Sequence, residues 1–452
     1  MLAIPAVAQQ PEENARPFHA VNCLSEDSVI GCCASGNCDS CGAPACDGSD
    51  CSSCGNSFCH NIRRRDQLLG DWLGIRPGLA HHGIVPDIQW TQFYQSVLTG
   101  GNDETSAYGG KFDYYFTFLG EQMGLCDGLT AVMHAETRHG NDIVLDAAPL
   151  AASNVNMIYP SLENETAITG MQFTQTFGPE WAVTFGKFNG LDFFQALYPQ
   201  TGRGIEGFMN TALLLPLSAA RTLPPAFLGA GLVRMKGRQI QAAAMVYDSN
   251  DITTTAGFDV LFNNGANFAG MWRFFTDRGG LPGSHLFVGT YATGDYTSLD
   301  PTGWDFFPDV GVVPPEKSGS WFFGYILEQK LWVDCCNSDR NIAFLGQLGF
   351  ADEETSQFEW TLNSSLQAQG MLLGRDQDTM GVGYFYSGLS GDFKRLLGAA
   401  GIAFRDVQGG EVFYNAAMTP WFHLTGDLQV IKPGLIANDT VVVAGLRANL
   451  RF

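Results

Sequence analysis

The stretch TVVVAGLRANLRF, residues 440–452, decides the fold class of this chain. In a β-strand, successive side chains point to opposite faces. One face of this strand is then wholly apolar, whereas the other carries Arg447, Asn449 and Arg451. Apolar-out, polar-in alternation with an aromatic residue at the rim is typical of an outer-membrane β-barrel strand. We therefore expect a closing barrel strand that ends at Phe452, although this stretch alone also fits an edge strand of a soluble sandwich.

Composition favours the barrel. Of the 452 residues, 45% are hydrophobic and only 16% are charged, against about 25% charged residues in typical soluble proteins. No run of about 18 apolar residues occurs, so no transmembrane helix is expected. The 54 glycines and the 12% of aromatic residues suit alternating strands with aromatic girdles. The length of the chain would allow several domains of about 150 residues. We expect one large barrel instead, because a single barrel can contain a chain of this length.

The chain is strongly acidic, with 46 acidic and 25 basic residues and a net charge of −21. This balance excludes nucleic acid as a partner, because nucleic-acid binding needs basic surface. In a channel it would favour cations. It would equally keep long polar loops soluble.

Two segments precede the predicted barrel at the amino terminus. Ala6-Val7-Ala8 is a small-x-small cleavage pattern, so residues 1–8 are interpreted as the remnant of a signal peptide. Residues 9–62 form a cysteine-rich extension, which we expect to lie in the periplasm. Its cysteines are Cys23, Cys32, Cys33, Cys38, Cys41, Cys46, Cys51, Cys54 and Cys59.

The cysteine-rich extension has almost no apolar residues, so a stable fold there would need disulfide bonds or a bound metal ion. Its CxxC pairs have zinc-like spacing, but disulfides are the expected outcome in an exported protein, and no metal or other cofactor is assigned. The extension holds nine cysteines, an odd number, and the remainder of the chain adds Cys126, Cys335 and Cys336. We hypothesise a disulfide from the extension to Cys126. A reduced metal site on the CxxC pairs is the alternative.

Residues 63–452 are predicted to form an all-β, transmembrane antiparallel barrel of about sixteen strands. Connections after odd strands are mostly long, whereas those after even strands are short, as in an outer-membrane meander. Both termini should then lie at the short-turn, periplasmic end. The predicted strands are 84–98, 106–121, 128–139, 166–176, 181–188, 226–236, 238–248, 265–276, 284–294, 320–333, 341–350, 362–373, 377–387, 410–419, 421–431 and 440–452.

Several motifs, in order, resemble the OprB-type carbohydrate-selective porins over roughly residues 66–452. They are LGDWLGIRP at 69–77, FGKFN at 185–189 with Asp192, FMNTAL at 208–213, RDQD at 375–378 and the late-strand segment 419–434. The resemblance implies a 16-stranded outer-membrane porin that passes sugars. The cysteine-rich extension departs from the family pattern, and its role stays open.

Charged residues on the lipid face would cost about 2–4 kcal/mol at mid-bilayer, so they must point into the lumen. A neutral sugar needs both donors and acceptors, beside aromatic faces. Glu136 with Arg138 and Lys111 with Asp113 supply such mixed pairs on one strand face. The predicted substrate-binding residues are Lys111, Asp113, Glu136, Arg138, Arg273, Asp427, Arg447 and Asn449. The alternative is that these are general wall charges. The loop 189–225, which carries Arg203 and Glu206, is expected to fold inward.

No catalytic residues are assigned, because neither HExxH nor GxSxG occurs. The expected partners are small carbohydrates, outer-membrane lipid and lipopolysaccharide, and further copies of the chain in a homotrimer. Peptidoglycan or a periplasmic partner could bind the extension. The competing hypothesis is a structural or adhesive anchor that displays the extension.

Overall fold

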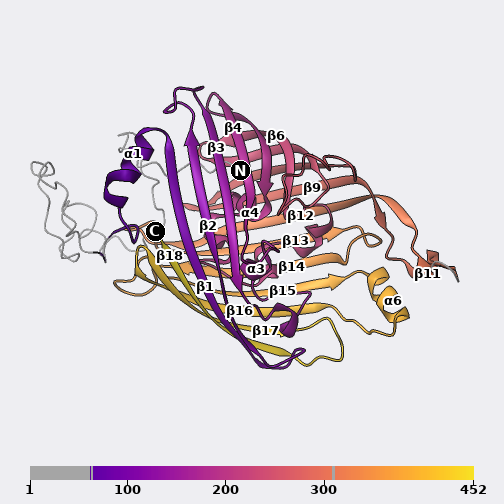
Figure 1. The fold of residues 1–452 in the computed structure, drawn as a ribbon. Helices are drawn as coiled ribbons and strands as arrows, with labels where there is room; N and C mark the ends of the chain where they lie inside the picture. Colours follow the sequence, from indigo (N-terminus) through magenta and orange to yellow (C-terminus); the bar gives the residue numbers. More distant parts are fainter. Residues whose placement is uncertain (1–61, 63–64, 308–310) are drawn as a thin grey trace, which may run out of the picture.

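The computed structural model describes residue 62 and residues 65–307 and 311–452. Sixteen of its strands close into one antiparallel barrel in which sequence neighbours pair and β1 pairs with β18 (Figure 1). This confirms the predicted class, strand number and meander order. The barrel strands are β1 (Ile84–Thr99), β2 (Ser106–Leu119), β3 (Leu129–Gly140), β4 (Thr166–Phe177), β5 (Trp181–Asn189), β6 (Ala226–Lys236), β7 (Gln239–Asp248), β8 (Ala266–Arg278), β9 (Leu281–Thr297), β12 (Glu316–Val333), β13 (Asn341–Ala351), β14 (Phe358–Gln369), β15 (Thr379–Leu389), β16 (Val407–Thr419), β17 (Phe422–Lys432) and β18 (Val441–Arg451).

Several strand predictions are displaced. β14 begins four residues earlier than predicted and stops at Gln369, because Gly370 has a φ of 68° and starts the turn toward β15. Leu373, which the hydrophobic pattern placed in the strand, is 93% exposed. β9 and β12 extend beyond their predicted ends as a paired hairpin. The loop between them carries the small hairpin of β10 (Asp305–Phe307) and β11 (Gly311–Val313).

The two faces of the wall alternate as the sequence predicts. In β18, Leu446 is 50% exposed whereas Arg447 is fully buried. Large apolar side chains such as Phe268, Trp272 and Phe274 lie exposed on the outer face, where lipid would cover them. None of the helices in the described part of the chain is long and apolar enough to cross a bilayer.

The two ends of the barrel differ. Figure 1 shows α1 (Ile75–His81) beside the C-terminus, whereas α6 (Gly391–Ala399) and β11 lie at the opposite end. Arg76 Nη2 donates to the Phe452 carbonyl over 2.7 Å, which ties the segment before β1 to the end of the last strand. Cys126 is exposed in the turn between β2 and β3. Its hypothesised partners in the cysteine-rich extension lie outside the described residues.

The longest connection between consecutive barrel strands, residues 190–225, folds into the lumen. It contains α4 (Gly190–Leu197), η3 (Pro199–Gly204), α5 (Thr211–Leu214) and η4 (Leu217–Arg221). Below, we call it the inward loop. Buried side chains of the opposite wall bind its backbone: Asn363 Nδ2 donates to the Ala212 carbonyl over 2.9 Å.

A second connection packs against the inward loop and was not predicted to do so. It contains α2 (Val144–Ala147) and α3 (Val155–Ile158). Val155 N donates to the Met209 carbonyl over 3.1 Å, and Thr211 N donates to the Ala152 carbonyl over 3.0 Å. The two connections together fill much of the barrel interior.

The main apolar core lies between the inward loop and the inner face of β6, β7, β8, β9 and β12. Phe194 and Tyr198 of the loop pack there against Phe227, Met245 and Leu286 of the wall. The core therefore occupies one side of the lumen, and the polar residues described next occupy another side.

Candidate functional site

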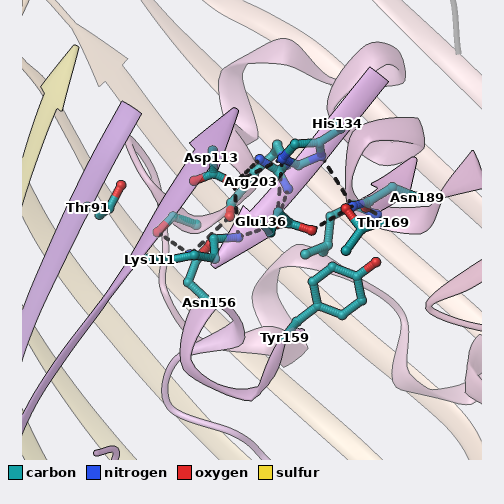
Figure 2. A network of polar contacts seen from close by, with 12 residues as sticks. Thr91, Lys111, Asp113, His134, Glu136, Asn156, Tyr159, Thr169, Asn189 and Arg203 are labelled. Atoms are coloured by element: carbon teal, nitrogen blue, oxygen red, sulfur yellow. Dashed lines mark hydrogen bonds and ion pairs between the residues drawn. The ribbon is translucent and has the colours of Figure 1, made fainter. Parts of the chain in front are cut away.

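A cluster of buried ionisable groups lies on the inner faces of β2 and β3. The register sets Asp113 directly opposite Glu136. Lys111 Nζ lies 2.6 Å from Glu136 Oε1 and 3.3 Å from Asp113 Oδ1, and all three side chains are fully buried. His134 Nε2 lies 3.1 Å from Asp113 Oδ1. Charges removed from water in this way need close partners, and Figure 2 shows these side chains converging.

Arg203 of η3 joins the cluster from the inward loop. Its Nη1 lies 3.2 Å from Asp113 Oδ1, and its Nη2 lies 3.1 Å from Glu136 Oε1. The guanidinium also lies over the Tyr115 ring, 5.6 Å from its centroid, and donates to the hydroxyl of that residue. A planar fork of donors suits this simultaneous contact with two carboxylates. The inward loop is thereby held against the charged wall.

Asp192, in the first turn of α4, completes the cluster. Its Oδ1 accepts from Tyr115 Oη over 3.0 Å, and its Oδ2 lies 2.7 Å from His134 Nδ1. Burial alone would raise the pKa of the Asp192 carboxyl, but the charges of Arg203 and His134 hold that pKa well below its usual range. Asn189 positions this helix, since its Oδ1 accepts from the Leu191 and Asp192 N–H groups, over 3.0 and 3.3 Å.

A polar cavity of about 540 Å³ adjoins the cluster. A second polar cavity of about 630 Å³ shares Glu206 and Arg451 with it. These two residues form an ion pair with each other. The first cavity is lined by Asp87, Gln89, Tyr115, His134, Gln172, Asp192, Gln195 and Arg203, among others. The lining therefore offers donors, acceptors and an aromatic ring together, which is the chemistry that hydroxyl-rich ligands need.

The structure separates one predicted pair. Glu136 belongs to the cluster, but Arg138 does not. Arg138 Nη1 instead lies 3.2 Å from Asp142 Oδ2 and also donates to the Met157 carbonyl. Its side chain is 13% exposed. Arg138 therefore supports the second inward connection.

Two other predicted residues bind the backbone of the inward loop. Arg447 donates to the carbonyls of Gly204 and Gly207 over 2.8 and 3.0 Å. Arg273 Nη2 donates to the Leu197 carbonyl over 3.0 Å. Both arginines are inward-facing and buried.

The last two predicted residues lie in the interior polar network near the closing strand. Asp427 Oδ1 accepts from Gln429 Nε2 over 3.0 Å, and Gln429 Oε1 accepts from Asn210 Nδ2 of the inward loop over the same distance. Asn449 Nδ2 donates to Thr91 Oγ1 of β1 over 2.8 Å. The direct contact of the predicted residues with a sugar stays a prediction.

Sequence reasoning did not select His134, Tyr115, Asp192 or Arg203 as site residues. The inward periodicity of β2 and β3 could have found His134 and Tyr115. Nothing in the loop sequence shows that Arg203, 90 positions from Asp113, reaches this wall.

Asp113, His134 and Glu136 have ligand atoms within 4.8 Å of one another, a spacing that could hold a metal ion. However, the ammonium group of Lys111 and the guanidinium of Arg203 already contact both carboxylates. Two cations at these oxygens oppose the entry of a third. The geometry therefore favours an ion-pair cluster over a metal centre.

Comparison with known proteins agrees with the fold. The sequence model described as carbohydrate-selective porin, OprB family, matches residues 103–452. The chain belongs to this family. The matched range starts after the LGDWLGIRP motif, so it does not include that part of the resemblance. OprB of Pseudomonas putida in its high-pH structure is similar, with a TM-score of 0.71 and 18% identity over 86% of this chain and 99% of that chain.

The low-pH structure of the same Pseudomonas putida protein has a TM-score of 0.52 and 14% identity, again over 86% of this chain and 99% of the other. At these identities the similarity shows the fold. No curated protein sequence matches this chain. As an OprB-family member, the chain is a sugar-selective porin of the outer membrane.

Proposed function

We propose that small neutral sugars diffuse passively through the polar side of the lumen, past the cluster of Lys111, Asp113, Glu136, Asp192 and Arg203. The observation that carries this proposal is the polar cavity of about 540 Å³ beside the cluster. No chemical conversion and no energy source are involved. The amino-terminal extension lies on the periplasmic side in this proposal.

The residues at the cavity surface provide the direct contacts. Asp192 is 22% exposed, whereas Lys111, Asp113 and Glu136 are fully buried behind it. Carboxylate and amide groups accept from and donate to sugar hydroxyls, and the Tyr115 ring can face the apolar side of a sugar. The buried ions keep Asp192 and Arg203 in fixed positions, so a sugar meets a preorganised surface.

The eight residues predicted from sequence act in this proposal mainly through the inward loop. Arg273, Arg447 and the network of Asp427 set the position of its backbone, and Asn449 joins the last strand to the first. Arg138 supports the neighbouring connection. Substitution of Arg273, Arg447 or Asp427 should change sugar selectivity by moving the loop.

Liposome swelling tests the proposal. Liposomes that contain the protein should swell faster in a small neutral sugar than in a large polysaccharide. In planar bilayers the protein should conduct ions, and the sugar should reduce the current. Swelling equal to that of empty liposomes would refute the proposal and would favour a plugged anchor.

The assembly of three copies also stays a proposal. The outer face of β7, β8 and β9 has a hollow of about 660 Å³ lined in part by Ala244, Gly270 and Gly289, where a neighbouring barrel could pack closely. Sedimentation equilibrium of the purified protein would distinguish a trimer from a monomer.

A further inference from the structure

A second cavity in the barrel has the opposite chemistry to the polar cavity. It has a volume of about 390 Å³ and lies between the inward loop and the inner face of β7, β8, β9 and β12. Wall side chains such as Met245, Met271 and Leu286 line it. They are at most 9% exposed. Phe193 and Leu223 of the inward loop line the other side.

Helix α4 separates the two cavities. Its Asp192 and Gln195 line the polar cavity, whereas its Leu191, Phe194 and Leu197 line the apolar one. A sugar in the polar cavity therefore does not reach the apolar cavity past this helix. The two cavities are separate compartments.

The polar groups around the apolar cavity are few and mostly occupied. Tyr247 Oη donates to the Thr222 carbonyl over 2.7 Å, and the Thr290 and Thr222 hydroxyls lie 2.6 Å apart. The Thr211 hydroxyl is buried and has no partner among the described residues. In the part of the chain that the structure describes, no charged side chain lines the cavity. A charged or hydroxyl-rich ligand would lose its hydration there without compensation, but a neutral apolar ligand with at most one hydroxyl would not.

The volume of the cavity indicates how large a ligand it could hold. Apolar cavities of about 150 Å³ stay dry and bind benzene, and the volume here is more than twice that. At about 30 Å³ for each water-sized group, it holds roughly a dozen non-hydrogen atoms. Ile158, at 40% exposed, lines it from α3 in the connection between β3 and β4, so the cavity borders accessible surface on this side.

We propose that this cavity is a second binding site, which takes one small neutral hydrocarbon-like molecule of about a dozen non-hydrogen atoms. The site is independent of the sugar path. The barrel would therefore bind small apolar compounds in this cavity as well as pass sugars.

Binding of radiolabelled naphthalene to proteoliposomes tests this proposal. The matched variants are Ala243→Leu and Ala242→Leu, because Ala243 lines the cavity, whereas Ala242, the preceding residue of β7, is paired with the outward-facing Trp272 of β8 and does not line it. Partition into lipid is the same in every sample, so the difference reports the site. The wild type and Ala242→Leu should bind about one naphthalene per chain saturably, and Ala243→Leu should bind at least 10-fold more weakly.

A second cavity variant, Ala219→Leu, fills the site from the loop side and should also weaken binding, even if Ala243→Leu fails to fold. Excess 1-decanol should displace naphthalene, and excess glucose should not. The absence of saturable binding above protein-free liposomes would overturn the proposal. Equal binding by both cavity variants and the wild type, or displacement by glucose, would also overturn it. None of these outcomes depends on whether the barrel passes sugars.

Discussion

The two sides of the inward loop are held by different forces. On the side of β2, β3 and β18, wall residues such as Lys111 and Arg447 contact the loop or its partners through ion pairs and hydrogen bonds. On the side of β7, β8 and β9, Met245, Met271 and Leu286 contact it mainly through apolar packing, to which a few hydrogen bonds, such as that of Arg273 to the Leu197 carbonyl, are added. Hydrogen bonds and ion pairs are directional, whereas apolar burial is not. The directional polar contacts therefore fix where the loop lies, and the apolar packing adds stability that does not depend on direction.

The largest effect on conductance and sugar block is expected when Arg203 is removed from the polar side. Arg203→Ala leaves Asp113 and Glu136 buried with less compensation, and removal of one partner of a buried ion pair costs about 3–5 kcal/mol. The inward loop should leave this wall, so single-channel conductance should rise and block by sugar should be lost.

Arg203→Lys is the control, since it keeps the charge without the planar fork and should give an intermediate block. Wild-type conductance and sugar block in Arg203→Ala would show that the cluster does not hold the loop.

A substitution on the apolar side should lower the stability of the protein without changing its sugar selectivity. Leu286→Ala removes a buried wall side chain that is 1% exposed. Such substitutions cost about 2–5 kcal/mol, and a residue beside an existing cavity should fall near 2 kcal/mol because it has fewer contacts to lose. Denaturant unfolding measures this cost.

The matched control is Phe287→Ala, which changes the next residue of β9, 40% exposed on the outer face. Sugar block should stay at the wild-type level in both variants. A loss of block in Leu286→Ala as large as in Arg203→Ala would remove the distinction between the two sides.

Much of the fold could be predicted from sequence because a barrel strand has a period of two. The outward face must suit lipid at every second residue, so the alternation of β18 and β3 is visible in the sequence. The alternation of connection lengths then gave the meander. The turn at Gly370 was misplaced because Met371, Leu372 and Leu373 continue an apolar pattern, and only a backbone dihedral shows the strand end.

The site was less predictable, for two physical reasons. Inward charges such as Lys111 could be found from periodicity, but their partner Arg203 comes from a loop without periodicity. The apolar cavity was hidden because its wall departs from the polar-in rule: Met271 faces inward although Trp272 faces outward. With both faces apolar, a strand gives no signal of which face lines a cavity.

A smaller effect is expected at Asp192, on the cavity side of the polar cluster. Asp192→Asn keeps the shape but removes the charge that contacts His134 and Arg203. Hydrogen bonds to charged groups contribute about 1.5–3 kcal/mol, and this carboxylate is partly exposed, so we expect a weakening of sugar block near the low end.

The lowered pKa of Asp192 in the wild type determines how the difference between the wild type and Asp192→Asn should depend on pH. A carboxyl whose folded pKa is lowered contributes stability above its unfolded pKa of about 3.9, and this contribution is lost as the pH falls through the folded value. Asp192 therefore stays charged from pH 7 to pH 5. The ratio of wild-type to Asp192→Asn block should be the same at both values, and convergence of the two proteins at pH 5 would contradict the assignment.

The smallest effect is expected from Arg138→Ala, which tests where the polar side ends. Arg138 pairs with Asp142 at 3.2 Å and donates to the Met157 carbonyl, so its loss should disturb the second inward connection and leave the ion pairs of the polar cluster in place. Glu136→Ala, by contrast, removes an acceptor of Lys111, Asn189 and Arg203. The double variant should therefore behave as Glu136→Ala alone when sugar block is measured in planar bilayers. If Arg138→Ala by itself reduced the block as much as Glu136→Ala, the sugar path would extend to the second inward connection, and the polar side would include both connections that fill the lumen.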